Sequence, residues 1–158
     1  MAKIDIRPAQ QGDETAVAAL LGPGDAEHAA ALPHVFNDCQ TRLRARALML
    51  NASRPDAALL LATKEDVAVG LICLELHQGQ TSPGEEKRRY AWILSIDVLP
   101  RHRRHGVGRA LIAAGEAWAK DQGASHLEFD VWEFNQGALA FYRALGYAPI
   151  SRMLSKPL

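Results

Sequence analysis

The spacing of apolar and polar positions changes along the chain between the period of a strand and the period of a helix. Short apolar runs and strict alternation predict strands, whereas recurrence every three to four positions between a cap and a glycine stop predicts helices. The predicted order is strand, two helices, three strands, helix, strand, helix, strand. The expected ranges are 3–8, 13–24, 36–51, 57–63, 67–76, 90–98, 106–123, 126–132, 135–146 and 149–154.

The first two helices are predicted from one apolar stripe each. Asp13 is expected to cap a helix that carries Val17, Leu20 and Leu21 and that ends at Gly22-Pro23-Gly24. The second helix is expected to bury the stripe formed by Phe36, Cys39, Leu43, Ala47 and Leu50.

The order of elements indicates an α/β fold with one mixed sheet. The strands at 57–63, 67–76 and 90–98 follow one another closely, which favours antiparallel pairing. The helix 106–123 then connects 90–98 to 126–132, as in a parallel crossover. We expect one domain over residues 1–158, since the chain has no linker, repeat or low-complexity segment.

Composition narrows the partners. The 18 basic residues balance 18 acidic ones, which argues against nucleic acid as a partner held by overall charge. Cys39 and Cys73 lie in apolar stretches without metal-ligand spacing, so two reduced, buried thiols and a cytoplasmic location are expected. No segment has the length of a membrane span, so no membrane partner and a soluble protein are expected.

The segment from Ile96 to Leu111 carries the most informative chemistry. A predicted strand runs through Pro100 into a basic cluster, two glycines and a helix. Gly106 and Gly108 have no side chains, and the first N–H groups of a helix are unpaired at its positive end. Arg101, Arg103, Arg104 and Arg109 add local positive charge, so the segment predicts a phosphate site.

This segment resembles the GNAT superfamily of acyl-CoA-dependent N-acetyltransferases. Arg103 through Gly108 matches the family's Arg/Gln-x-x-Gly-x-Gly/Ala motif, and the segment from Asn135 to Tyr147 is similar to a second family segment. The resemblance implies a mixed sheet with antiparallel N-terminal strands and a splay between the parallel fourth and fifth strands, with acetyl-CoA as co-substrate and no metal. The implied contacts to it are Ile96, Val98, Arg103, Arg104, His105, Gly106, Val107, Gly108, Arg109, Asn135, Ala138 and Tyr142.

The resemblance also implies direct transfer to an amine. Tyr142 is expected to protonate the departing thiolate, and the backbone at Val98 to pair with the pantetheine arm. The proton acceptor stays open, because Trp92 occupies the position where we expect the glutamate of some family members. Candidates are Glu75, Glu133 and Asp97, although simple alternation places Asp97 on the opposite face from Trp92.

The acceptor is not fixed by the sequence. It is a small amine or a peptide amine, with an aminoglycoside, an amino acid or a lysine all open, and a homodimer is also left open. Trp92, Trp132, Phe134 and Phe36 line an acceptor pocket or belong to the core, whereas Trp118 falls on a helix stripe and is expected in the core. The alternative function is a non-catalytic acyl-CoA-binding sensor, and a nucleic-acid reader built on Arg101–His105 is a third reading.

Overall fold

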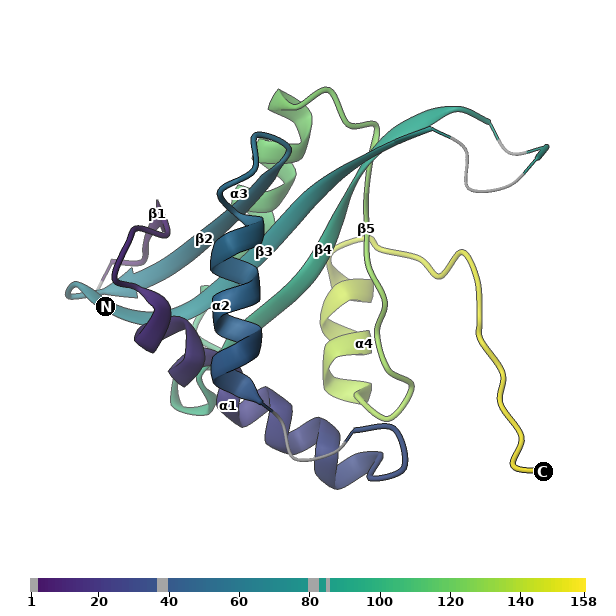
Figure 1. Cartoon of the computed structure of the whole chain (residues 1–158), viewed down its shortest axis with the longest axis horizontal. Coiled ribbons are helices and arrows are strands. Elements are labelled where there is room, and N and C mark those ends of the chain that lie inside the picture. The colour runs from purple at the N-terminus through teal and green to yellow at the C-terminus, as the bar shows by residue number, and fades with distance from the viewer. Residues whose placement is uncertain (1–2, 37–39, 80–82, 85) are drawn as a thin grey trace.

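The fold is built on one mixed sheet. The computed structural model describes residues 3–36, 40–79, 83–84 and 86–158. Within these residues the sheet has the order β1 (Asp5–Pro8), β2 (Ala57–Lys64), β3 (Val67–Gly79), β4 (Arg88–Val98) and β5 (His126–Glu128) (Figure 1). Neighbouring strands are antiparallel from β1 to β4, and β4 pairs with β5 in parallel. The predicted mixed α/β class is therefore confirmed.

Helices cover both faces of the sheet. Helices α1 (Glu14–Ala31) and α2 (Thr41–Asn51) pack on one face through a cluster that includes Leu21, Ala45 and Leu71. Helix α3 (Val107–Asp121) packs on the other face, where α4 (Gln136–Ala144) adds side chains to a second cluster around Ile72 and Leu111. A short 3₁₀ turn, η1 (Pro100–His102), connects β4 to the segment before α3.

Helix α1 does not end at Gly22-Pro23-Gly24. It continues through Pro23 to Ala31, so the predicted stop is wrong. Proline lacks an N–H but has a φ that suits a helix. The helix keeps a buried face beyond the proline, because Asp25 is only 4% exposed and is held by partners on α2.

Helix α2 buries a different face from the one expected. It begins at Thr41 rather than at Phe36, and Leu43 and Leu50 of the predicted stripe are exposed. Ala45 is fully buried instead, and Leu48 and Met49 pack beside it. The ion pair between Arg44 and Asp25 explains the rotation, because it turns this side of α2 toward α1. Cys39 lies outside the described residues.

The C-terminal segment forms no sixth strand within the described residues. Residues 149–154 were expected to be a strand, but the chain from Tyr147 onward has no regular structure, and Ile150, Met153 and Leu154 are at least 79% exposed. Figure 1 shows this segment, in yellow, leaving α4 and running away from the sheet. A segment with apolar residues forms a strand only beside another strand, and none of the five described strands pairs with this one.

A bulge in β4 decides which side chains face α1 and α2. Ser95 pairs with Cys73 and Ile93 pairs with Leu74, so Leu94 has no partner on β3. One extra residue reverses the alternation of side chains beyond it. Asp97 therefore shares the face of Trp92, and the face expected for Asp97 from simple alternation is corrected.

Candidate functional site

A cavity opens where β4 and β5 separate. Their ladder covers only three residue pairs and ends at Trp92 and Glu128, so the strand predicted over 126–132 is shorter in the structure. A cavity of about 370 Å³ lies beyond this point. It is lined by α1, α2, the bulged half of β4, the segment after β5 and α4: Gly24, Asp25, His28, Phe36, Arg44, Ile93, Leu94, Ser95, Ile96, Asp97, Phe129, Asp130, Val131, Trp132, Asn135, Ala138 and Tyr142.

Tyr142 presents a free hydroxyl to this cavity. Its ring packs against Phe129 at 4.5 Å and Phe141 at 5.1 Å between ring centroids. Among the described residues the hydroxyl has no hydrogen-bond partner, but it is not fully buried. In the described part of the chain, the fully buried side-chain polar atom that lacks a partner is Nδ2 of Asn51. The Tyr142 hydroxyl is therefore accessible from the cavity. Burial, with the nearby charge of Asp97, raises the pKa of Tyr142 above its usual range.

Asp97 is a half-buried carboxylate that lines the cavity. Its Oδ2 accepts a hydrogen bond of 2.7 Å from the hydroxyl of Ser95, two residues earlier on β4. Burial raises the pKa of Asp97, and the Ser95 bond and the charges of Arg44, His28 and Arg103 oppose that rise without cancelling it.

A second acidic side chain beside it is already neutralised. Asp25 accepts a hydrogen bond from Thr41 at 2.9 Å and pairs with the guanidinium of Arg44. Arg44 also reaches the hydroxyl of Ser95 at 3.3 Å. Asp25, Arg44 and Ser95 thus form a connected polar chain that ends on Asp97.

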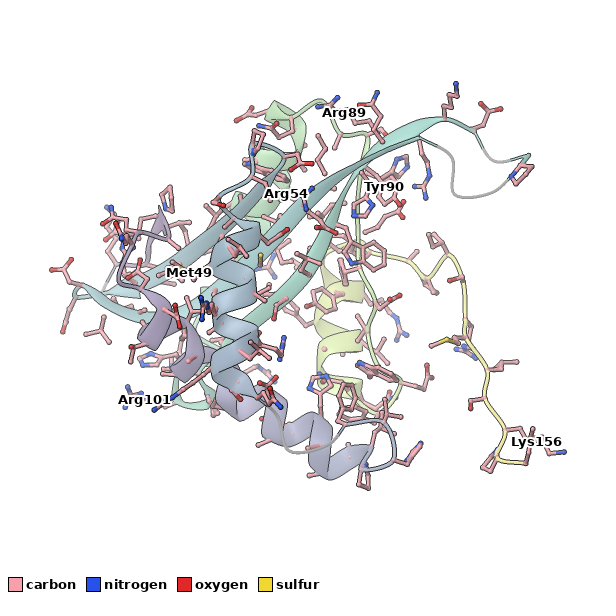
Figure 2. The ribbon with its side chains drawn as sticks, viewed as in Figure 1. Met49, Arg54, Arg89, Tyr90, Arg101 and Lys156 are labelled. Carbon is pink, nitrogen blue, oxygen red and sulfur yellow. The ribbon has the colours of Figure 1, made fainter. Side chains whose placement is uncertain are left out.

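The predicted phosphate turn follows β4 directly. Gly106 precedes the first residue of α3 with φ of +83°, a conformation that glycine adopts without strain, and Arg104 has φ of +63°. No side chain caps α3, so its first N–H groups remain open. The exposed side chains around the turn are those of Arg104, His105 and Arg109, and Val107 is buried beneath it. Figure 2 shows Arg101 pointing away from the body of the protein.

Gly108 and Arg103 have local partners of their own. A Cβ on Gly108 would lie 3.2 Å from Cζ of Phe141, so this glycine lets α4 pack closely on α3. Arg103 donates from Nε to the carbonyl of Val98 at 3.1 Å and pairs with Glu27 at 2.8 Å. The backbone at Val98 is expected to pair with the pantetheine arm, and its carbonyl already has this partner within the chain.

The remaining predicted residues fall in two groups. Asn135 caps α4, its side chain accepting from the N–H of Ala138 at 3.0 Å, and both residues line the cavity together with Ile96. Glu75 and Glu133 are absent from the lining. Glu75 is held by His77 at 2.8 Å and Arg54 at 3.6 Å, and Glu133 is an exposed carboxylate 3.8 Å from Arg152.

Aromatic rings also line the cavity, among them His28, Phe36 and Trp132. His28 meets the edges of Phe36 and Phe134, each with ring centroids 5.3 Å apart, and Phe36 meets Trp132 at 5.2 Å. Trp118 packs in the core cluster, as expected. Cys73 is also buried, and burial raises the pKa of its thiol to about 12.

Sequence patterns did not point to Asp25, Arg44 or Ser95. Their contacts cross 19 and 51 residues of chain, and no local spacing encodes them. The one available signal was Ser95-x-Asp97, since side chains two apart on a strand share a face.

One further cavity lies outside the candidate site. This second cavity of about 310 Å³ lies between the end of α3 and Tyr147, where Glu116 already accepts a hydrogen bond from the Tyr147 hydroxyl.

None of the helices in the described ranges has both the length and the apolar character needed to cross a membrane.

Comparison with known proteins identifies relatives of this architecture. The sequence model described as acetyltransferase (GNAT) family matches residues 25–147. Aminoglycoside N(6')-acetyltransferase type 1 of Klebsiella aerogenes is 28% identical over 110 residues, covering 67% of this chain and 70% of that protein. Streptothricin acetyltransferase of Streptomyces lavendulae is 39% identical over 56 residues, covering 35% of this chain and 30% of that enzyme.

The fold is shared over nearly the whole chain with a solved structure. A mutant of the BH1408 protein from Bacillus halodurans superposes with a TM-score of 0.91 at 24% identity, covering 98% of this chain and 99% of that one. The chain spans less than a third of the length of the first curated relatives that it matches.

Proposed function

Because the chain belongs to the acetyltransferase (GNAT) family, we propose that it moves an acetyl group from acetyl-CoA to a primary amine in one ternary complex. The observation that carries the proposal is the cavity at the β4/β5 opening, which is lined by Tyr142, whose hydroxyl has no partner among the described residues, and by the half-buried carboxylate of Asp97. Acetyl-CoA supplies the activated acetyl thioester. Everything else is done by side chains and main-chain groups of the protein.

The residues at the phosphate turn fit the pyrophosphate of coenzyme A. The open N–H groups at the start of α3 suit an anion, and Gly106 leaves that helix end without a side chain above it. Arg104, His105 and Arg109 are exposed around it and would hold the anion by charge, whereas Arg103 orders the turn through Val98 and Glu27.

The opening between β4 and β5 fits an extended arm. Past Trp92 the main chain of β4 has no strand beside it on the β5 side. Ile96 and Ala138 line this part of the cavity, and Asn135 holds the mouth of α4. The open main chain of β4 would align the thioester arm by hydrogen bonds, in the way that it would align a neighbouring strand.

Tyr142 is suited to act as the acid. A phenol whose pKa is raised stays protonated throughout the neutral range, so it has a proton to give to a departing thiolate. Its hydroxyl is accessible and is not engaged elsewhere in the described residues.

The relatives support an amine acceptor. The names of the Klebsiella and Streptomyces relatives denote acetylation of an aminoglycoside and of streptothricin. We propose the same bond chemistry here, on a small amine or a peptide amine. Glu75 and Glu133 stay candidates for the proton acceptor only through a relay of water, since neither lines the cavity.

The test combines binding with turnover. Calorimetry should show that the protein binds coenzyme A, and thiol release from acetyl-CoA should appear with at least one member of a panel of primary amines. Tyr142→Phe should lower kcat by ~10²–10⁴-fold, the usual contribution of a general acid, while coenzyme A affinity stays the same.

Tyr90→Phe is the matched control. It removes the same hydroxyl from a ring that stacks on His77 outside the cavity, near the far end of β4 (Figure 2), so kcat should not change. Tight coenzyme A binding without turnover on any amine would favour the sensor, and no binding at all would remove the proposal.

A further inference from the structure

The acceptor side of the cavity is built around one carboxylate oxygen. Oδ2 of Asp97 is engaged by Ser95, but Oδ1 has no hydrogen bond to the described residues. Oδ1 is also not fully buried, so a ligand in the cavity can reach it. An open carboxylate oxygen in a desolvated position binds a cation or takes up a proton.

Helix α1 is shaped to leave room for this oxygen. A Cβ on Gly24 would lie 2.5 Å from Oδ1, closer than side-chain carbons approach oxygen. The main chain of α1 therefore comes directly against the carboxylate, and any other residue at position 24 would displace it. Gly22, one residue before Pro23 on the same helix, has open space instead.

The charged groups around Asp97 come from every element that packs on it. Arg44 of α2 is directed to Ser95 and to Asp25 of α1, and His28 of α1 bonds the carbonyl of Gly24 at 2.7 Å. Arg103 lies beyond the end of β4 and contributes a weaker positive charge, and Tyr142 faces it from α4. Asp25 already pairs with Arg44 and Thr41, and Asp130, the third carboxylate of the lining, is exposed. Asp97 is therefore the carboxylate left for a ligand in the less exposed part of the cavity.

We propose that Asp97 is the catalytic proton acceptor, and that the acceptor amine enters as its ammonium ion and docks on Oδ1. This inference rests on the proposed acetyl transfer and names the group that the sequence left open. Ser95, Arg44 and Gly24 are positioning residues, which hold the carboxylate in place without touching the substrate.

The protons and electrons balance in the following way. The ammonium gives one proton to Asp97, and the freed lone pair forms the N–C bond to the acetyl carbon. The C–S bond breaks, its electron pair leaves on sulfur, and Tyr142 protonates that sulfur. The second proton that the nitrogen loses restores Tyr142, and Asp97 releases its proton to solvent, so one proton leaves per turnover.

Position and environment agree with this role. A base works best when its pKa lies nearer to the working pH than that of an ordinary carboxyl group, and burial moves the pKa of Asp97 in that direction. The rate of the unmodified enzyme should fall on the acid side as Asp97 becomes protonated.

The first experiment replaces the carboxylate. Asp97→Asn should lower kcat/KM by ~10²–10⁴-fold at pH 7 and should abolish the acid limb of the pH profile between pH 5 and 9. Coenzyme A affinity, measured by calorimetry, should stay within about twofold, since Asp97 is not part of the phosphate turn. Asp121→Asn removes an exposed carboxylate at the end of α3, outside the cavity, and should leave the rate unchanged.

The second experiment moves the carboxylate without changing it. Gly24→Ala should lower kcat while coenzyme A affinity is kept, whereas Gly22→Ala, with open space at its Cβ, should retain full activity. An Asp97→Asn enzyme with an unchanged rate and acid limb would overturn the inference, as would a fully active Gly24→Ala enzyme. Loss of coenzyme A binding by the unmodified protein would instead refute the underlying acetyl transfer.

Discussion

Asp97 occupies a position that suits chemistry and disfavours folding. Burial raises its pKa, so the folded chain binds this proton more tightly than the unfolded chain does. Below the unfolded pKa of about 3.9 both states are protonated and the group is neutral. As pH rises through the folded pKa, the charge forms in a desolvated place and stability is lost.

Asp97→Asn should therefore make the protein more stable above neutrality. The gain in free energy of unfolding at pH 8 should fall within the ~0.5–2 kcal/mol typical of single stabilising substitutions, and it should vanish near pH 3.5. Urea unfolding followed by circular dichroism at the two pH values measures it. A variant that is less stable than the parent at pH 8 would show that the charge is fully compensated by Arg44 and Ser95.

At the same scale, the sequence pointed to some residues of the candidate site and not to others, for one reason. Gly106, Asn135 and Tyr142 belong to local patterns, a glycine turn, a helix cap and a helix face, which a short segment encodes. Asp25 and Arg44 act through partners that only the folded chain brings together. The Glu75 side chain has the chemistry of a general base, but in the folded chain it pairs with Arg54 and His77.

At the scale of the elements, the stability of helix α4 depends on the cap at its first turn. Asn135 supplies the cap, and Phe141, Tyr142 and Leu145 pack in the core cluster. Asn135→Ala should lower the free energy of unfolding by ~1 kcal/mol, whereas Asn135→Ser should retain most of it. Thermal unfolding compares the three proteins, and an alanine variant as stable as the parent would mean that packing alone holds α4.

Element boundaries were predictable where the chain marks them by itself. Gly123 and Gly146, with φ of +74° and +91°, lie just past α3 and α4 as expected. The bulge at Leu94 was not predictable, because it exists only in the register between β3 and β4. The passage of α1 through Pro23 was missed for a similar reason, since contacts with α2 outweigh a local helix breaker.

For the whole molecule, we expect the C-terminal segment to add little to the free energy of unfolding. The apolar side chains Ile150, Met153, Leu154 and Leu158 are exposed, and Figure 2 shows Lys156 near the end of an extended chain far from the helices. Deletion of residues 149–158 should change the free energy of unfolding by no more than about 0.5 kcal/mol. Urea unfolding of the truncated protein measures this, and a larger loss would mean that the segment packs on the fold in solution.

The separation of β4 from β5 leaves a gap between the last two strands of the sheet, past the three residue pairs that join them. The proposed carrier would complete this ladder and bind the folded chain alone, so at a hundred times its Kd it would add ~2.7 kcal/mol to stability. The lifetime of the protein in a cell would then follow the supply of its own acetyl donor. Starvation for that donor would shorten the protein's survival as well as slow its turnover.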